Sequence, residues 1–273
     1  PEGGSARTFS RPGLEKIMKN CGVKDYSFYY PYPDYKFPTA IYSDKRLPYQ
    51  GELTNNMRNF DRDRMVLFNE KYVFDGMIED GLFPVFSNSY MVVIGKEPEI
   101  VYAKYSNDRA EEYILRTEMV ETNRGKMIRK IPLSEKAQDH VRAMEHAYQL
   151  LLRRYEGSAL HINPCIPAED GSYVEFPYEK GTALSQLLDE CLEKDDMDGF
   201  YRLFDRYLNL ISYGEESGIT DYDMIFANIL VDGDHWTLID YEWTFDRVID
   251  TKALAFRAIY CYVLEDERRN ALE

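Results

Sequence analysis

Residues 218–246, GITDYDMIFANILVDGDHWTLIDYEWTFD, carry the pattern that most constrains the fold of this chain. Two apolar runs flank the turn Asp232-Gly233-Asp234. An Asp-Gly turn between such runs predicts an antiparallel hairpin. Asp223 and Asn228 precede the first strand, and Asp240 follows the second. Closing the hairpin would therefore bring these three side chains to one end of it.

Oxygen-bearing side chains that meet there suit Mg²⁺ on a nucleoside triphosphate, with a carboxylate that orients an acceptor hydroxyl. Asp223-x-x-x-x-Asn228 followed by Asp240 resembles the catalytic loop and metal-binding Asp of the protein-kinase-like fold, in the branch of aminoglycoside and choline kinases. The resemblance implies that Asp223 deprotonates the acceptor, that Asn228 and Asp240 hold Mg²⁺, and that Glu242 assists at a second metal. A plain β-hairpin with an acidic turn is the alternative.

Two departures from the family pattern bear on activity. Asp221 stands where the family has a His that mainly makes structural hydrogen bonds, and an Asp can accept backbone N–H bonds there instead. No G-x-G-x-x-G loop occurs upstream to cover the phosphates. These departures keep open a catalytically weak pseudokinase that serves as a scaffold or nucleotide-gated regulator.

The elements upstream follow the order of a kinase N-lobe. We expect strands over 99–105, 113–121 and 126–133, then a helix from Ser134 to about Tyr155 with one apolar face. The predicted class is α+β: a bilobal protein-kinase-like fold with an antiparallel-sheet N-lobe, a reduced helical C-lobe and an N-terminal extension.

The same register suggests which residues bind the nucleotide. Lys130 falls on the third strand and Glu145 on the helix, and we expect them to form the Lys–Glu ion pair that positions the phosphates. A competing register uses Lys104 with Glu118 and ranks second, because 113–121 alternates like a strand. Arg109, in the loop between the first two strands, could contact phosphate in place of the glycine-rich loop.

The segment after the helix resembles a kinase hinge. Residues 159–176 are expected to form two strands, and a helix should follow Gly181. We map the backbone groups that would bind adenine to the Pro177 carbonyl and the Glu179 N–H. Further helices are expected over about 195–213 and 252–264.

The N-terminal part of the sequence does not follow the kinase-like pattern. A short helix over residues 10–22, followed by an aromatic strand, weakly resembles the closing elements of a class I S-adenosylmethionine-dependent methyltransferase. We therefore expect three segments: an N-terminal extension or methyltransferase-like remnant (1–50), a kinase-like N-lobe with a leading helix (51–176), and a hinge with the C-lobe (177–273). The basic cluster Arg58, Arg62 and Arg64 is expected to pair mainly with neighbouring acids.

Composition excludes some classes of function. A net charge of −15 argues against nucleic acid as a partner, since phosphate backbones require a basic surface. The four cysteines lack C-x-x-C spacing, and no apolar run approaches the ~18 residues that span a membrane. We expect a cytoplasmic protein, with peripheral association at the inner membrane face left open.

The sequence thus predicts an ATP- and Mg²⁺-dependent phosphotransferase that acts on a hydroxyl of a small molecule or glycan. Resemblance to bacterial methyltransferase–kinase proteins favours surface-polysaccharide modification, with a fused methyltransferase domain as a partner.

Overall fold

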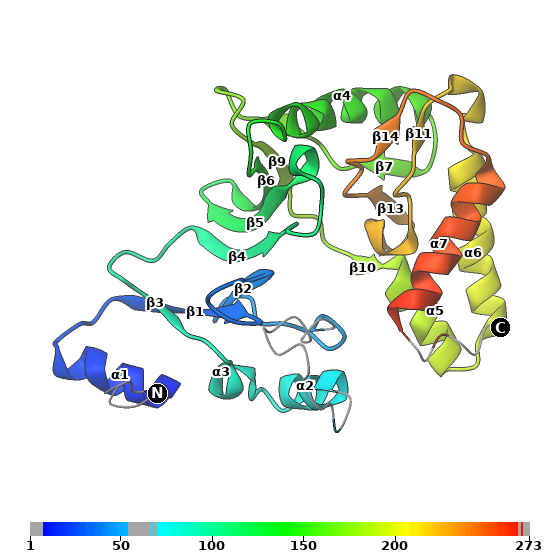
Figure 1. Cartoon of the computed structure of the whole chain (residues 1–273). Coiled ribbons are helices and arrows are strands. Elements are labelled where there is room, and N and C mark those ends of the chain that lie inside the picture. Colours follow the sequence, from blue (N-terminus) through cyan, green and yellow to red (C-terminus); the bar gives the residue numbers. More distant parts are fainter. Residues whose placement is uncertain (1–7, 54–66, 68–69, 267–268, 270–273) are drawn as a thin grey trace. The chain divides into compact units, whose positions relative to one another are not determined.

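The computed structural model describes residues 8–53, 67, 70–266 and 269 (Figure 1). The Arg58, Arg62 and Arg64 cluster lies outside these ranges. The chain divides into two compact units that interleave in sequence: unit 1 comprises residues 1–108 and 116–124, and unit 2 comprises 109–115 and 125–273. The breaks fall at 108, 115 and 124, while the functional division of the chain at 50 and 176 stays a prediction.

Unit 1 is built on an antiparallel sheet with strand order β3-β1-β2-β4-β5. Its helices and strands are α1 (Arg11–Asn20), β1 (Tyr26–Tyr32), β2 (Ala40–Ser43), α2 (Glu70–Glu79), α3 (Phe83–Phe86), β3 (Met91–Ile94), β4 (Ile100–Tyr105) and β5 (Leu115–Thr122), the first residue of which belongs to unit 2. The core is aromatic: Tyr30 and Tyr42 each meet the Phe83 ring edge-on, with centroids 5.8 and 5.6 Å apart.

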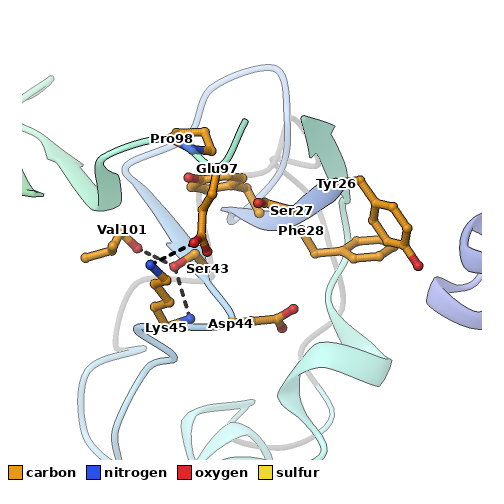
Figure 2. A pocket seen from close by; sticks show the side chains of 10 residues that line it. Tyr26, Ser27, Phe28, Ser43, Asp44, Lys45, Glu97, Pro98 and Val101 are labelled. Atoms are coloured by element: carbon orange, nitrogen blue, oxygen red, sulfur yellow. Dashed lines mark hydrogen bonds and ion pairs between the residues drawn. The ribbon is translucent and has the colours of Figure 1, made fainter. Parts of the chain in front are cut away.

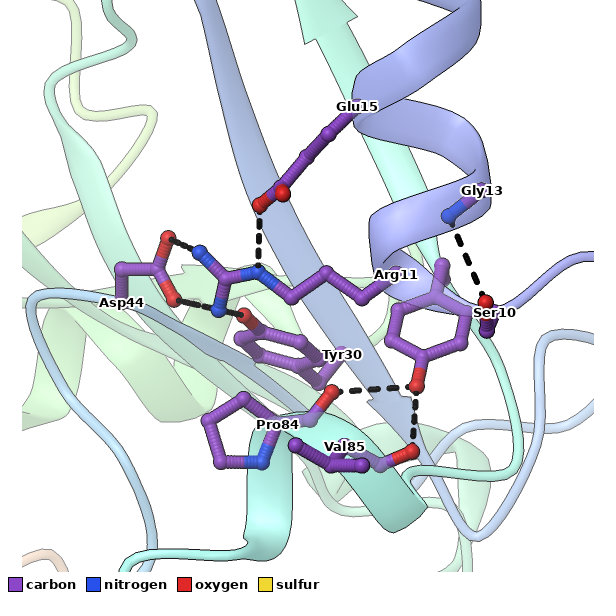
Figure 3. A network of polar contacts seen from close by, with 9 residues as sticks. Ser10, Arg11, Gly13, Glu15, Tyr30, Asp44, Pro84 and Val85 are labelled. Carbon is purple, nitrogen blue, oxygen red and sulfur yellow. Dashed lines mark hydrogen bonds and ion pairs between the residues drawn. The ribbon is translucent and has the colours of Figure 1, made fainter.

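Figure 3 shows how α1 is fastened to this sheet. The Ser10 hydroxyl accepts a hydrogen bond from Gly13 N–H, which caps the helix as the sequence predicts. Arg11 forms a two-pronged ion pair with Asp44, with Nη1–Oδ1 at 2.7 Å and Nη2–Oδ2 at 2.9 Å. Tyr30 also donates its hydroxyl to Asp44. These contacts link the first helix to β1 and to the residue that follows β2.

Unit 2 contains most of the helices (Figure 1). Its elements are β6 (Gly125–Pro132), α4 (Gln138–Arg154), β7 (Leu160–Ile162), β8 (Ile166–Pro167), β9 (Val174–Pro177), β10 (Thr182–Ala183), α5 (Leu184–Glu193), α6 (Met197–Ser212), β11 (Thr220–Asp221), β12 (Ile229–Asp232), β13 (His235–Leu238), β14 (Thr244–Phe245) and α7 (Thr251–Glu265). β6, β9 and β8 pair in that order, β10-β12-β13-β7 form a second sheet, and β11 pairs with β14. Helices α5, α6 and α7 pack side by side around one large apolar core.

The expected α+β class and the order of its elements are confirmed, with two local differences. The long helix begins at Gln138 rather than Ser134, because the Ser134 hydroxyl accepts Ala137 N–H and closes a separate turn ahead of the helix. Three short strands, β7, β8 and β9, replace the two expected over 159–176. No helix in the described ranges is long and apolar enough to cross a bilayer.

Candidate active site

The loop that carries Asp223 is fixed from both sides within unit 2. β11 pairs with β14, so Asp221 lies opposite Thr244, and Tyr222 N–H donates to the Trp243 carbonyl at 3.0 Å. After Asp223, one 3₁₀ turn (Phe226–Asn228) leads into β12. The predicted hairpin of β12 and β13 is confirmed. Its open end is closed by Ile239 N–H, which donates to the Asn228 carbonyl at 2.9 Å.

Asp223 and Asn228 are in contact, as the spacing predicts. The Asn228 side-chain Nδ2 donates to the Asp223 carbonyl at 2.9 Å, which sets the amide so that Oδ1 remains available as an acceptor. The Asp223 carboxylate is mostly buried and ion-pairs with Arg257 Nη2 of α7. Arg257 also donates its Nε to the Tyr222 carbonyl at 3.0 Å. The proposed base therefore has a cationic partner that the sequence did not suggest.

Asp221, in the place of the family's His, makes the expected backbone contact. Its Oδ1 accepts Asp223 N–H at 3.1 Å, and the side chain is almost wholly buried. Among the described residues its Oδ2 has no hydrogen-bond partner. Burial raises the pKa of Asp221 to about 8, since the charged form is poorly solvated there. This carboxyl is consequently protonated at neutral pH.

Lys130 is buried at the centre of an ionic cluster. Its Nζ pairs with Asp240 Oδ1 and lies 3.3 Å from Glu242 Oε2. Glu242 is itself buried, with Oε1 2.6 Å from Arg109 Nη2 and Oε2 3.5 Å from His140 Nε2. Burial disfavours a charge on Glu242, but the cationic Lys130 and Arg109 outweigh this effect and hold its pKa far below the usual range. The cluster joins β6, α4 and the segment after β13.

The expected Lys130–Glu145 ion pair is not formed. Glu145 lies on an exposed part of α4, while Asp240 and Glu242 already balance the buried Lys130 charge. In the competing register, residues 113–121 would have to be a helix, yet β5 is a strand. Lys104 is exposed on β4, and Glu118 pairs with Arg116 at 2.8 Å. A role for Glu145 at the nucleotide stays a prediction.

The remaining predicted nucleotide contacts are placed but not brought together. Arg109 is engaged with Glu242, and its guanidinium lies over the Trp243 ring at 5.7 Å. The Pro177 carbonyl accepts Asn163 Nδ2 at 3.1 Å and retains its second lone pair. Glu179 follows β9 and is partly buried. Their roles at phosphate and adenine stay predictions.

The oxygen ligands present fit Mg²⁺. Asp240 adopts a left-handed backbone (φ 54°) and its side chain is 46% exposed, with only Oδ1 engaged by Lys130. Asp240 and Asn228 Oδ1 are two hard oxygen ligands, and Mg²⁺ commonly uses one or two such ligands plus phosphate oxygens. No group of three His, Cys, Asp or Glu suited to a metal occurs in the described part of the chain. Both oxygens of Glu242 face cations, so its role as a second metal ligand stays a prediction.

The sequence did not predict a functional role for three residues near the site: Arg257, Trp243 and His140. The rings of His140 and Trp243 contact each other at a tilt of 39° with centroids 5.0 Å apart, which places α4 against the segment that follows Asp240. Arg257 and His140 belong to no recognisable motif, and Trp243 ends the segment Asp240-Tyr241-Glu242-Trp243 that stands at the metal-binding motif. The charge of Arg257 alone could have drawn attention, because it interrupts the otherwise apolar run Ala253–Leu264 of α7.

Residues of unit 1 line a pocket of their own (Figure 2). It has a volume of about 100 Å³ and is lined on one side by Ser43, Asp44 and Lys45. Its one lysine is already neutralised by Glu97 at 3.1 Å and Glu121 at 2.7 Å. This small polar pocket therefore offers no uncompensated positive charge to a ligand.

Comparison with known proteins gives structural neighbours only. No protein-family model and no curated protein matches the chain. Similar solved structures include aminoglycoside phosphotransferase APH(2'')-Ib with ADP (10% identity, TM-score 0.31, covering 63% of this chain and 82% of that one). A type I macrolide 2'-phosphotransferase (14%, 0.30, 61% and 76%) and the Mycobacterium tuberculosis PknI kinase domain (13%, 0.33, 62% and 78%) are also similar. Likeness at this level supports no function by itself. A function therefore has to be argued from the residues of the site.

Proposed function

We propose that unit 2 is a protein-kinase-like phosphotransferase that uses ATP and Mg²⁺ and transfers phosphate to a hydroxyl of a small molecule or glycan. The observation that carries the proposal is the convergence of Asp223, Asn228 and Asp240 at one end of the hairpin, with buried Lys130 paired to Asp240. The surface-polysaccharide setting and the fused methyltransferase belong to the proposal through sequence resemblance alone. The cytoplasmic location is part of the proposal through the cysteine pattern and the hydropathy of the sequence.

In this mechanism Asp223 orients the acceptor hydroxyl and accepts its proton as the hydroxyl oxygen bonds to the γ-phosphorus and the bond to ADP breaks. Asn228 and Asp240 would hold Mg²⁺, which supplies charge neutralisation on the phosphates. Lys130 keeps Asp240 in place and would contact a phosphate oxygen of the bound nucleotide. Arg257 orients Asp223 through Oδ1 and leaves the other carboxylate oxygen for the acceptor.

A test of nucleotide binding uses Asp240→Ala. We expect Mg·ATP to raise the melting temperature of the wild type but not of the variant, because the exposed Asp240 is a proposed metal ligand. The matched control is Asp234→Ala, which removes an exposed Asp at the other end of the same hairpin. Equal Mg·ATP protection of wild type and Asp240→Ala would disprove the assignment of Asp240.

One observation favours a non-catalytic alternative. The Arg257 guanidinium already forms an ion pair with Asp223, as it would in a nucleotide-binding scaffold. Asp223→Asn separates the two functions. If Asp223 is the base, the variant should keep Mg·ATP affinity while acceptor phosphorylation falls by about 10²–10⁴-fold, measured as acceptor-dependent ADP release. A scaffold would show no acceptor-dependent ADP release in the wild type either.

A further inference from the structure

A pocket of about 430 Å³ opens beside Asp223, entirely within unit 2. It is lined by Tyr222, Trp243, Phe245, Arg247 and Arg257. Tyr222 immediately precedes Asp223, and Arg257 ion-pairs with it, so the pocket adjoins the proposed base. Its volume falls in the range of small-molecule sites, ~300–1,000 Å³.

The charge of this pocket is opposite to that of the whole chain. Both of its charged lining residues are arginines, although the chain carries a net charge of −15. Arg257 donates hydrogen bonds from Nη2 to the Asp223 carboxylate and from Nε to the Tyr222 carbonyl. Arg247 is exposed, and within the described ranges no carboxylate lies at ion-pair distance from it. A cationic group at the edge of a pocket, without an acidic partner, suits an anionic ligand.

The other three lining residues are aromatic. The Arg257 guanidinium lies over Tyr222 at 4.1 Å and that of Arg247 over Phe245 at 5.0 Å, so each cation is held against a ring. Trp243 packs against the rings of His140 and Tyr113, with centroids 5.0 and 5.1 Å away. Rigid aromatic faces give a ring-shaped ligand a flat surface to pack on, and the arginines would fix the ligand's orientation.

We propose that this pocket is the acceptor subsite and that it selects a sugar ring bearing an anionic group, a carboxylate or a phosphate. The proposal rests on the proposed function in one respect: it takes Asp223 as the group that the acceptor hydroxyl approaches. Arg247 binds the anionic group, the aromatic side chains pack on the ring, and a hydroxyl of the same sugar reaches Asp223.

Trp243 supplies a direct readout of binding that needs no turnover. The chain has two tryptophans, and Trp236 is only 1% exposed, whereas Trp243 lines the pocket. Tryptophan fluorescence is titrated with glucose, glucuronate and glucose 1-phosphate, without nucleotide. We expect the two anionic sugars to change the signal at concentrations about tenfold or more below glucose, since a charge-assisted contact is gained. The signal should vanish in Trp243→Phe.

Arg247→Ala tests the origin of the preference. We expect the affinity for the anionic sugars to fall by about tenfold or more while that for glucose is unchanged. Arg202→Ala is the matched control, because Arg202 is a largely exposed arginine of the same unit outside the pocket. A stronger response to glucose 1-phosphate than to glucuronate identifies a phosphorylated sugar, and the reverse order a sugar acid.

Equal responses to all three sugars, or an Arg247→Ala variant that binds them like the wild type, would overturn the inference. Its failure is distinct from that of the proposed function. Anionic sugars that bind through Arg247 without any ADP release support the subsite and count against the kinase. Neutral sugars that are phosphorylated equally by wild type and Arg247→Ala support the kinase and count against the subsite.

Discussion

At the scale of single residues, Asp221 stands where the kinase-like pattern has a His. It keeps the structural role of that residue but brings a different charge. Its Oδ1 performs the backbone contact with Asp223 N–H, and its buried Oδ2 makes no hydrogen bond within the described residues. A protonated Asp and an Asn have the same shape and nearly the same hydrogen-bonding groups. Protonation therefore removes most of the cost of burying this side chain, and that cost should depend on pH.

Asp221→Asn is expected to change the pH dependence of stability. Folding raises the Asp221 pKa from its ordinary value of 3.8 to about 8, so between these values the folded state binds more protons than the unfolded state. Wild-type stability should then fall as pH rises through this window, by up to ~1.4 kcal/mol per pH unit from this group. The variant lacks this contribution.

Urea denaturation at several pH values, without Mg²⁺ or nucleotide, measures the effect. The two proteins should be about equally stable near pH 4, and the variant should gain a growing advantage up to pH ~8. Parallel stability curves for wild type and Asp221→Asn over this range would mean that Asp221 is ionised in the folded protein.

At the scale of elements, Arg154 at the end of α4 holds the approach to the catalytic loop. Its Nε donates to the Tyr213 carbonyl at 2.9 Å, Nη2 to Ile211 at 2.7 Å, and Nη1 to the Ile219 carbonyl. One buried guanidinium thus joins the ends of α4 and α6 to the segment that leads into β11.

Replacing Arg154 with Lys should cost about 3 kcal/mol of unfolding free energy, because a single ammonium cannot reach all three buried carbonyls. Urea unfolding followed by tryptophan fluorescence measures this, since both tryptophans lie in unit 2. Arg153→Lys, at the exposed neighbouring position on the same helix, is the control and should change nothing measurable. A loss no larger than in the control would show that the three carbonyls do not depend on Arg154.

The same scale shows what a sequence pattern can and cannot predict. Alternation and the Asp-Gly turn predicted β12 and β13, and with them the meeting of Asp223 and Asn228, because these are local features. The start of α4 was misplaced, since the turn at Ser134 depends on one side-chain hydrogen bond. Local spacing also failed for Lys130, whose partner Glu242 lies 112 residues away in the chain. Pairings at such separations depend on tertiary packing, as does that of Arg257 with Asp223.

At the scale of the whole molecule, the residues that the structure describes form two separate apolar cores. One is the aromatic core of unit 1, which contains Phe83, and the other is the larger core of unit 2, which contains Met144. A domain with its own core can unfold on its own.

We therefore expect two unfolding transitions. Phe83→Ala should lower the stability of unit 1 by about 3–5 kcal/mol and leave the transition seen by tryptophan fluorescence in place. Met144→Ala should shift the fluorescence transition by about 2–5 kcal/mol and leave the other transition, seen by circular dichroism, unmoved. A single transition that both variants shift equally would mean that the units fold as one.

The interleaving of the two units limits how such a protein can be assembled or dissected genetically. Because β5 belongs largely to unit 1 but follows residues 109–115 of unit 2, no single break in the gene separates the two. A deletion that ends at residue 108 would remove β4 and leave β5 with an unpaired edge, a surface prone to aggregation. Residues 116–124 belong to unit 1 but lie between two segments of unit 2. Any continuous gene segment that encodes all of one unit therefore also encodes part of the other.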